Sequence, residues 1–539
     1  MTEQVENTAA DVMVAELRAR GVTHIATLNG HGLDPFYLAC RRAEMRMIDV
    51  RNEQSASYMA EITGRLSRRV GVCAVSGAVA HANALTGVLN SHFDGSPMLL
   101  ITGTTPLADM DWGEFQDFNP VPLAEPICKY ARLVDDAHRI GQYVHEAFTV
   151  ATTGRPGPVH LSLPMDVASA VVDQPLQSGV QSGEVRIEGA ADPALIQQAA
   201  DWIGQAERPL LVAGSGVYYS RGESALAKMK LPTVVPIWDR GCVNTPLDTY
   251  VGVIGAASGG ASLLEDADLI VMVGAEFDYR IGQISPPKIH PQAKVIRIHA
   301  DASRLRNGLE ADLSIQASPR AALEQLAQCD LPRFEDWLAE TKGRRDAHRN
   351  AVLAKPMEGK INARDVVLAV QELLTEETVL LVDAGNIGQW FHQLIGSDIY
   401  PGHWSTCGAS GVVGWGLPGA MAARLVYPDR PIILLSGDGS FTFTLAELEC
   451  ASRQGLPFVA IVADDEQWGI TASSHYESLG FTMYTQLGPT RLDQVAEGLN
   501  CHGVRIEQID QLIPAVREAL VGNRPTVIQV PIAPGSPTL

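Results

Sequence analysis

The sequence predicts an α/β protein built from doubly wound parallel sheets. Helical segments alternate with short apolar runs along the whole chain, which is the pattern of repeated βα units. Runs such as 431–435 lack the polar alternation of a half-exposed strand, so we expect strands buried on both faces. Glycine-rich turns follow several runs at their carboxyl ends, where open parallel sheets bind ligands. At 539 residues the chain has room for three or four such domains.

Composition and charge exclude several classes of function. The chain is 46% hydrophobic and 19% charged, as expected of a globular protein with an ample core. A formal net charge of −21 argues against nucleic acid and anionic membranes as partners. No apolar stretch approaches the ~20 residues needed to span a bilayer, and residues 1–7 do not have the order of a signal peptide. The eight cysteines lack any Cys-x-x-Cys spacing, so we expect reduced thiols and a cytoplasmic location.

The apolar pattern places the main elements. A helix is expected over 9–20, and a linker rich in Gln, Ser and Gly over 172–189. Strands are expected at 24–28, 45–50, 69–76, 98–101, 209–213, 268–274, 378–383, 431–435 and 457–462. A turn at 408–416 precedes a further helix.

The strongest site signal is Gly437-Asp438-Gly439-Ser440, directly after the apolar run 431–435. Glycines have no Cβ, so backbone N–H groups there can approach an anion closely. A second apolar run ends at Asp464-Asp465, with Asp465 27 positions after Asp438. Two neighbouring strand ends would then present carboxylates, which suit a Mg²⁺ ion that holds a diphosphate. Between them, Thr444 to Glu447 has the pattern of a capping box that opens a helix.

These motifs resemble the cofactor-binding motif of thiamine diphosphate enzymes, in the branch of acetolactate synthase, benzoylformate decarboxylase and benzaldehyde lyase. The resemblance implies two similar sheets that flank a middle one. It places an aminopyrimidine-binding domain at 1–185, a middle domain at 190–345 and a diphosphate-binding domain at 360–539. A duplication agrees with this, since residues 155–164 resemble residues 524–531. The family usually has Asn-Asn or Asn-Asp at the position of Asp464-Asp465, so this site gains negative charge.

The same resemblance assigns roles around the cofactor. Glu53, in Arg51-Asn52-Glu53-Gln54, matches the Glu whose carboxylate favours the aminopyrimidine tautomer able to remove the thiazolium C2 proton. The alternative is a solvated Glu at a helix start, which the helix dipole favours. Val413 would support the bent cofactor, and the Gly411 carbonyl would meet its 4′-amino group. The remaining cofactor residues are Gly437, Asp438, Gly439, Ser440, Asp465, Trp468, Gly469 and Ile470, with Asp438, Asp465 and the carbonyl of Gln467 as Mg²⁺ ligands.

The substrate pocket is assigned from the resemblance too. Asn29 and His31 follow the first expected strand, and Gln116 matches an active-site Gln of the family. His81 lies in a loop one residue longer than the usual glycine-rich loop. For each His, a satisfied core or surface position is as good an interpretation as a catalytic one. Ile470 occupies a position that is often smaller in relatives acting on aromatic substrates, which predicts short aliphatic substrates.

The implied activity is cleavage or formation of a C–C bond next to the carbonyl of a 2-oxo acid, aldehyde or acyloin, with decarboxylation, lyase activity and carboligation left open. A coenzyme A-linked lyase is disfavoured because the chain stops soon after a last expected strand, which ends near Val530. A cofactor-binding homologue without turnover is disfavoured by Glu53. A nicotinamide oxidoreductase would need a third glycine after Gly214-x-Gly216. FAD is disfavoured because the loop 274–280 only partly resembles the flavin-contacting loop.

The resemblance also bears on assembly. In the family's geometry Glu53 belongs to one subunit and the metal-binding residues to its neighbour. We therefore expect a homodimer or homotetramer with sites at the subunit interface.

Overall fold

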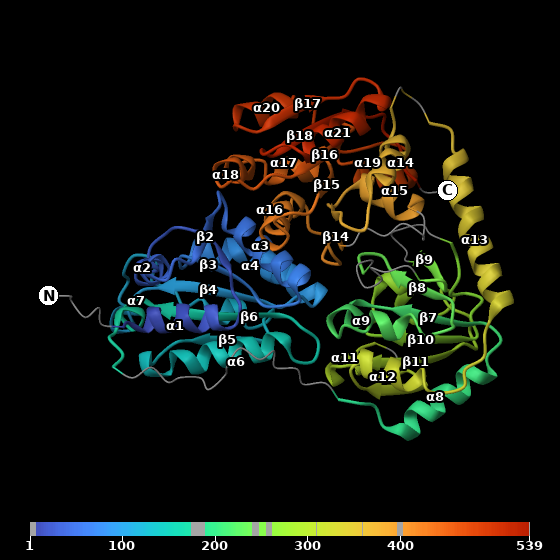
Figure 1. Ribbon diagram of the computed structural model, residues 1–539, viewed down its shortest axis with the longest axis horizontal. Helices are drawn as coiled ribbons and strands as arrows, with labels where there is room; N and C mark the ends of the chain where they lie inside the picture. The colour runs from blue at the N-terminus through green and yellow to red at the C-terminus, as the bar shows by residue number, and fades with distance from the viewer. Residues whose placement is uncertain are drawn as a thin grey trace. The chain divides into compact units, whose positions relative to one another are not determined.

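The computed structural model describes residues 7–173, 189–239, 247–254, 261–308, 310–357, 359, 361–395 and 403–537. These residues form three six-stranded sheets (Figure 1), and the strands pair in parallel in each of them. The α/β class and the three parallel sheets are confirmed. Most of the expected linker at 172–189 lies outside the described residues.

The first sheet has the order β2-β1-β3-β4-β6-β5. Its strands are β1 (His24–Leu28), β2 (Arg46–Asp49), β3 (Gly71–Val75), β4 (Met98–Thr104), β5 (Tyr130–Leu133) and β6 (Pro158–Pro164). Its helices are α1 (Ala9–Ala19), α2 (Asp34–Arg42), α3 (Glu53–Ser67), α4 (Val79–Asp94), α5 (Val121–Ala124), α6 (Ile140–Thr152) and α7 (Met165–Ser169). Every residue of β4 and β6 is buried, because α3 and α4 cover one face of the sheet and α1 and α6 the other (Figure 1).

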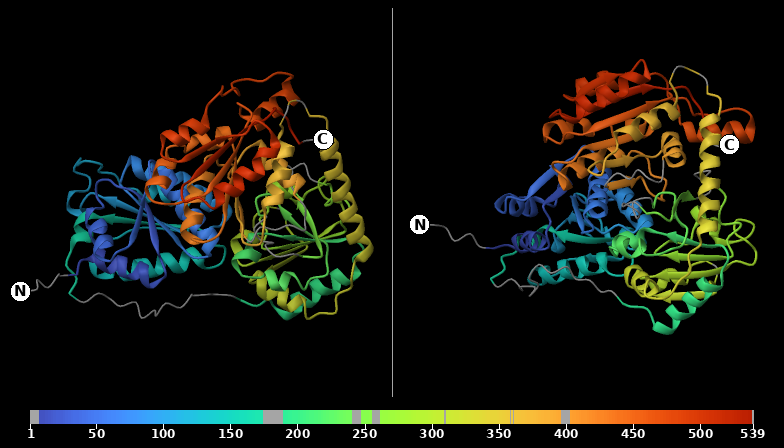
Figure 2. Two further views of the ribbon diagram at one scale, coloured as in Figure 1. Left: turned by 45° about the horizontal axis from the view of Figure 1, so that its top comes forward. Right: turned by 45° about the vertical axis from the view of Figure 1, so that its right-hand side comes forward.

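The second sheet has the order β12-β11-β10-β7-β8-β9, the arrangement of dinucleotide-binding folds. Its strands are β7 (Pro209–Ala213), β8 (Thr233–Pro236), β9 (Tyr250–Ile254), β10 (Leu269–Val273), β11 (Lys294–His299) and β12 (Leu313–Gln316). The helices of this segment are α8 (Pro193–Gln205), α9 (Ser215–Tyr219), α10 (Glu223–Leu226), α11 (Ala302–Leu305), α12 (Pro319–Leu326) and α13 (Glu335–Ala354). The long helix α13 leads from this sheet to the third (Figure 2).

The third sheet has the order β14-β13-β15-β16-β18-β17, which repeats the order of the first sheet. Its strands are β13 (Val379–Val382), β14 (His403–Thr406), β15 (Ile432–Gly437), β16 (Val459–Asp464), β17 (His502–Arg505) and β18 (Thr526–Pro531). Its helices are α14 (Ala363–Leu373), α15 (Asn386–Leu394), α16 (Gly416–Val426), α17 (Asp438–Phe443), α18 (Glu447–Arg453), α19 (Gly469–Leu479), α20 (Leu492–Gly498) and α21 (Leu512–Leu520). The similar sequences at 155–164 and 524–531 contain β6 and β18, which occupy the same place in the two sheets.

The chain forms two compact units. The first comprises residues 1–187 with 417–429 and 444–456, and the second comprises the remainder, including the second and third sheets. The helix α18 therefore belongs to the same unit as the first sheet, although its sequence lies in the third segment.

The expected capping box at Thr444–Glu447 is wrong. A helix already starts at Asp438, at the end of β15, and α18 starts at Glu447 after a turn. The residue that caps α18 is Ala446, and no side chain caps this end. The Glu447 carboxylate instead accepts a hydrogen bond from the backbone N–H of Arg51, a partner that no local sequence pattern identifies.

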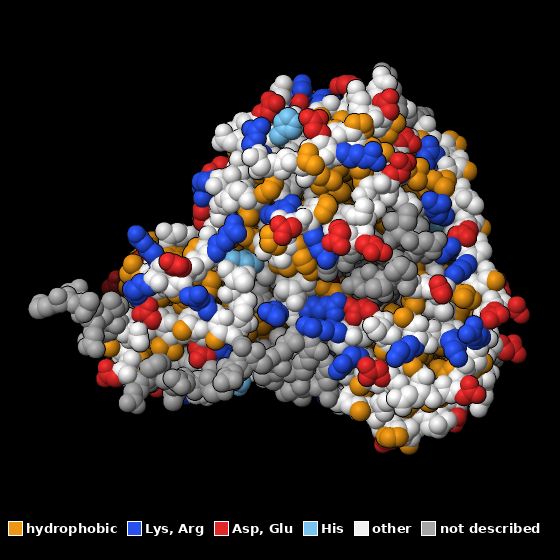
Figure 3. Space-filling model, in the orientation of Figure 1, with side chains coloured by type: hydrophobic (Ala, Val, Ile, Leu, Met, Phe, Trp, Pro, Cys, Tyr) orange, Lys and Arg blue, Asp and Glu red, His pale blue; other side chains and the backbone are white. Residues whose placement is uncertain are grey.

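Charged side chains of both signs are interspersed on the face drawn in Figure 3. The excess of acidic residues is therefore not gathered there into one patch. Among the described helices, none is long and apolar enough to cross a membrane.

Candidate functional site

The third sheet has a topological switch point between β13 and β15. The two strands are neighbours in the sheet, but the chain leaves β13 toward β14 on the opposite side. Ligands of open parallel sheets bind at such a point, beyond the carboxyl ends of the strands. Asn386 begins the helix after β13, and Asp438 begins the helix after β15. The predicted diphosphate motif therefore lies where the topology favours a site.

Buried carboxylates gather at these strand ends. Burial, together with the charges of Asp465 and Asp464, raises the pKa of Asp438 to about 8. Burial also raises the pKa of Asp465 to about 6, while hydrogen bonds from Gln467 act in the opposite direction. Carboxylates that are held close together repel one another, and a bound cation would remove this repulsion. Their oxygens are also the ligands that Mg²⁺ prefers. Within the described residues, no three His, Cys, Asp or Glu side chains form a metal-binding group, so an ion here would need oxygen ligands besides carboxylates.

The two adjacent aspartates face different partners. Oδ2 of Asp464 accepts a hydrogen bond of 2.5 Å from Nε2 of Gln529 on β18, and Oδ1 accepts one from the backbone N–H of Glu466. Asp464 thus fixes the ends of two neighbouring strands. Oδ2 of Asp465 instead lies 2.7 Å from the point that a Cβ on Gly469 would occupy. Only glycine fits at that position without displacing the carboxylate.

The other predicted cofactor residues lie around this cluster. A Cβ on Gly439 would lie 2.8 Å from the ring of Trp468, whereas one on Gly437 would make only an ordinary contact of 4.0 Å with the carbonyl oxygen of Ala463. Oγ of Ser440 donates to the carbonyl of Ala384, which ties α17 to the end of β13. Ile470 is partly exposed on the first turn of α19. The close approach of the Trp468 ring thus requires the glycine at 439.

The turn that carries Val413 contains two glycines with positive φ, on either side of that residue. Gly411 has a φ of 72° and Gly414 one of 75°, a conformation that favours glycine. A Cβ on Gly414 would also overlap the side chain of Phe443. Val413, between them, is half-buried.

Asp383 is a buried residue of this site that the sequence reasoning missed. Its carboxylate accepts hydrogen bonds from the backbone N–H of Ala384 at 2.8 Å and from Oγ of Ser436 at 3.3 Å. Backbone N–H groups of Trp415 and Gly416 also donate to it, while burial raises its pKa to about 6. Asp383 therefore joins the ends of β13 and β15 to the turn that carries Val413. The signal was its place at the end of an expected strand.

Asn386 was missed as well. Its Nδ2 donates to the carbonyl of Gly535, and Nε1 of Trp390 donates to the same oxygen. Its Oδ1 is buried and has no hydrogen-bond partner among the described residues. Its Cβ lies 3.1 Å from the point that a Cβ on Gly469 would occupy. A buried polar atom without a partner at a switch point fits a ligand or water bound there.

Glu53 lies in the other compact unit, at the first position of α3. Asn52 caps this helix by accepting a hydrogen bond from the backbone N–H of Gln54 at 2.9 Å. Oε2 of Glu53 accepts a hydrogen bond of 3.0 Å from Nδ2 of Asn83 on α4. Glu53 is half-buried, so it is more constrained than a solvated residue at a helix start.

The first sheet also has a switch point, between β1 and β3, and polar residues lie beyond it. Oγ of Ser76 lies 2.7 Å from the carbonyl oxygen of His31 and 2.9 Å from Oε1 of Gln116. The ring of His31 meets the ring of Phe115 edge-on, with centroids 5.3 Å apart. Asn29 is exposed at the end of β1. The hydroxyl of Ser76 thus joins the side chain of Gln116 to the backbone of His31.

His81 lies elsewhere, in the interior between α4 and the sheet. Its Nδ1 is 2.8 Å from Oγ1 of Thr102, and its ring lies 4.8 Å from that of His160. Burial lowers the pKa of His81 to about 4, so the ring is neutral at pH 7. This environment favours the core interpretation of His81 that the sequence left open.

Comparison with known proteins agrees with this geometry. Three family models match successive parts of the chain. They are the N-terminal TPP binding domain of thiamine pyrophosphate enzymes at residues 7–123, the central domain at 196–326 and the C-terminal TPP binding domain at 383–530.

Curated relatives match almost the whole chain. The acetolactate synthase large subunit IlvG of Mycobacterium tuberculosis is 26% identical over 97% of this chain and 95% of its own length. The acetolactate synthase isozyme 1 large subunit of Escherichia coli is 27% identical, over 97% of this chain and 94% of its own. A glyoxylate carboligase of Escherichia coli O157:H7 is 26% identical, over 95% and 90%. With all three domain models matched in order, the chain belongs to the thiamine pyrophosphate enzymes.

Proposed function

We propose that this protein is a thiamine diphosphate- and Mg²⁺-dependent enzyme that forms or breaks a C–C bond next to a carbonyl. Its substrates would be small 2-oxo acids, aldehydes or acyloins. The buried carboxylates at the switch point of the third sheet carry this proposal, because they suit a cation that holds a diphosphate. Relatives named acetolactate synthase and glyoxylate carboligase favour carboligation over simple decarboxylation.

The residues of the second unit would hold the cofactor. Asp438, Asp465 and the carbonyl of Gln467 would bind Mg²⁺, and the buried Oδ1 of Asn386 would bind a ligand or water at the same place. Val413 would support the bent cofactor from its turn.

The chemistry divides between cofactor and protein. When bound, thiamine diphosphate supplies a thiazolium carbon that adds to the substrate carbonyl. Glu53 would hold a proton at the aminopyrimidine ring, and Asn83 would orient its carboxylate. His31 and Gln116 would bind the substrate oxygens, with Asn29 at the same edge of the sheet.

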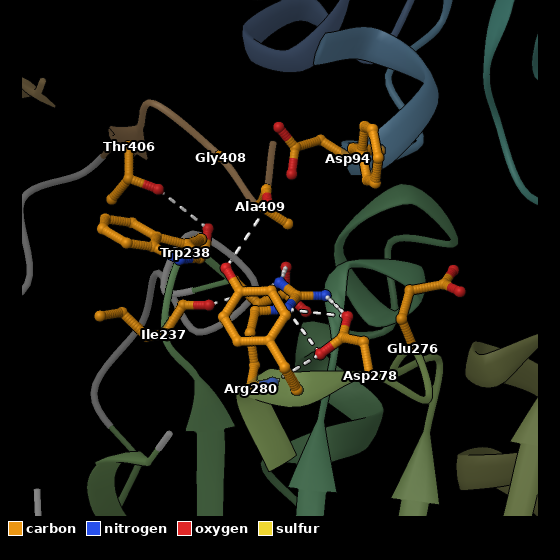
Figure 4. A network of polar contacts seen from close by, with 12 residues as sticks. Asp94, Ile237, Trp238, Glu276, Asp278, Arg280, Thr406, Gly408 and Ala409 are labelled. Atoms are coloured by element: carbon orange, nitrogen blue, oxygen red, sulfur yellow. Dashed lines mark hydrogen bonds and ion pairs between the residues drawn. The ribbon is translucent and has the colours of Figure 1, made fainter. Parts of the chain in front are cut away.

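We propose that the middle domain is a scaffold and not a flavin site. In the loop after β10, the guanidinium of Arg280 is paired with Asp278 at 2.8 Å (Figure 4). It is also paired with Asp239 at 3.0 Å. Its charge is therefore balanced within the protein instead of being directed to a diphosphate. Glu276, in the same loop, adds a negative charge, partly met by Arg304 at 3.8 Å. Protein purified without added flavin should show no absorbance near the flavin band.

The domain limits and the assembly belong to the same proposal. We propose domains at 1–185, 190–345 and 360–539, and a homodimer or homotetramer in which Glu53 of one subunit serves the metal site of another. Light scattering at several protein concentrations tests the assembly. A catalytically active monomer would contradict a shared site.

The function is tested by incubating the protein with thiamine diphosphate, Mg²⁺ and a panel of pyruvate, glyoxylate, benzoylformate and acetoin. We expect turnover of at least one compound, lost with chelator and restored by Mg²⁺. The variant Glu53→Gln should bind the cofactor and lose most turnover. An amide, unlike a carboxyl group, cannot take up and release the proton at the aminopyrimidine ring. If the cofactor binds and none of the panel reacts, the proposal of a non-catalytic homologue is the better one.

A further inference from the structure

The Glu447 carboxylate is buried and binds backbone 396 residues away in the sequence. Its side chain belongs to a residue that is 1% exposed. Both carboxylate oxygens accept from the backbone N–H of Arg51, at 3.0 and 3.1 Å. Burial raises the pKa of Glu447 above its usual value, although the hydrogen bonds that the carboxylate accepts act in the opposite direction. Burying a carboxylate costs free energy unless it is hydrogen-bonded. This contact therefore links two specific segments of the first unit.

Other side chains at the end of α18 bind the same segment, the turn between β2 and α3. Arg453 makes two hydrogen bonds with the carboxylate of Asp49, at 2.8 and 3.0 Å. Nε2 of Gln454 donates to the carbonyl of Asp49 at 2.7 Å. Figure 1 shows α18 beside β2, which ends at Asp49. The backbone between β2 and α3 is thus held at Asp49 and at Arg51.

This turn leads directly to Glu53. Arg51 is followed by the cap residue Asn52 and then by Glu53, so a shift of the Arg51 amide moves the start of α3. We propose that Glu447 is a positioning residue that sets where the Glu53 carboxylate lies, and that α18 acts as its support. The proposal rests on the proposed role of Glu53 as the group that holds a proton at the cofactor.

The position of Glu447 in the chain also predicts which property of the site depends on it and which does not. Glu447 follows Asp438 by nine positions. In the proposed assembly, one short segment therefore supplies a ligand to one metal site and supports the Glu53 that serves the site of another subunit. A residue with that role should change the proton chemistry at the cofactor and leave diphosphate binding intact, since Asp438 and Asp465 are untouched.

The test compares Glu447→Gln with Glu449→Gln, its matched control on the same helix. Glu449 also pairs with Arg51 and with Arg453, but through the exposed side chains of those residues. The amide oxygen of Gln can still accept a hydrogen bond from them, and exposed ion pairs contribute little. We expect Glu447→Gln to slow exchange of the cofactor's C2 proton and lower kcat by roughly 10- to 100-fold, as a small misplacement of a catalytic group does. The dissociation constant for thiamine diphosphate with Mg²⁺ should change little. Glu449→Gln should behave as wild type in all three measurements.

A second readout uses the protein without cofactor. Hydrogen exchange followed by mass spectrometry should show faster amide exchange at residues 49–55 in Glu447→Gln, and no change in Glu449→Gln. If Glu447→Gln does not fold, Arg453→Gln takes its place, because its pair with Asp49 is exposed and its loss should slow C2 exchange to a smaller degree.

Two outcomes separate this inference from the proposed function. If Glu53→Gln loses C2 exchange and Glu447→Gln keeps it, Glu447 has no positioning role. If Glu53→Gln itself keeps C2 exchange, the assigned role of Glu53 is wrong and the inference falls with it.

Discussion

Nδ2 of Asn83 donates a hydrogen bond of 3.0 Å to Oε2 of Glu53, which joins α4 to the first residue of α3. A donor at this distance orients the carboxylate that accepts its hydrogen bond. Neither residue is deeply buried, so the contact can be removed without disturbing the core. This pair gives the first prediction.

We expect Asn83→Ala to lower kcat by roughly tenfold, because the Glu53 carboxylate loses its orienting donor. Asn83→Asp should lower it further, because the donor is replaced by a like charge that repels the Glu53 carboxylate. The measurement is kcat. Thr86→Ala, at an exposed position of the same helix, is the control and should match wild type. A kcat unchanged in both Asn83 variants would show that this contact does not affect catalysis.

The second prediction concerns acid stability. Burial lowers the pKa of His81 from 6.5 to about 4, and burial and the charge of Arg46 lower that of His24 to about 4. The unfolded chain binds a proton at these residues below pH 6.5 and the folded protein does not. The free energy of unfolding contributed by each His therefore falls as the pH falls from about 6.5 to about 4, by roughly 3 kcal/mol.

Buried carboxylates act in the opposite sense, so the comparison must isolate one residue. The raised pKa of Asp438 favours the folded state as the pH falls. We therefore compare urea unfolding of wild type and His81→Gln between pH 7 and pH 5. The variant should be less stable at pH 7, where its hydrogen bonding to Thr102 is altered, and the difference should shrink as the pH falls. A difference constant with pH would mean that His81 has the same pKa in the folded and the unfolded protein.

How far the sequence predicted the fold depends on whether the signal is local. The strand at 24–28 was predicted to the residue, because its apolar run is bounded by polar and glycine residues. The capping box at 444–447 was wrong because Glu447 has a partner far away in the sequence, Arg51. Local pattern rules compare residues three or four positions apart and cannot register such a contact.

The site shows the same division. Asp438 and Asp465 were predicted because a glycine motif and a strand end mark them. Asp383 and Asn386 were not predicted. They belong to the site because β13 lies beside β15, and this order of strands in the sheet is not visible in the local sequence. The Gln529 contact of Asp464 likewise depends on the pairing of β16 with β18.

The third prediction concerns retention of the cofactor. Asp438, Asp465 and Asp464 bring three carboxylates to one region, and a diphosphate adds further negative charge. We expect purified protein to lose thiamine diphosphate on dialysis and Asp465→Asn to bind it at least as tightly, because one like charge is removed. The measurement is the dissociation constant at fixed Mg²⁺. Glu466→Gln, which removes an exposed neighbouring charge, is the control. Weaker binding in Asp465→Asn alone would mean that the site requires the carboxylate.

The last prediction concerns substrate size. Ile470 lies on the first turn of α19, next to Gly469, where an added Cβ would meet Asp465 and Asn386. If this side chain faces the substrate, its bulk should favour short aliphatic substrates, since close-packed sites do not absorb added volume freely. One methylene in an apolar pocket changes discrimination by roughly 1–3 kcal/mol.

Ile470→Ala should therefore shift the ratio of kcat/KM for benzoylformate over pyruvate, or for benzoin over acetoin, toward the aryl substrate by roughly tenfold or more. Leu479→Ala, at an exposed position on the last turn of the same helix, is the control and should leave the ratio unchanged. The ratio is the informative quantity because a general loss of stability lowers both rate constants together. If the ratio stays the same in Ile470→Ala, the side chain does not line the pocket, and the preference for short substrates has no basis in this residue.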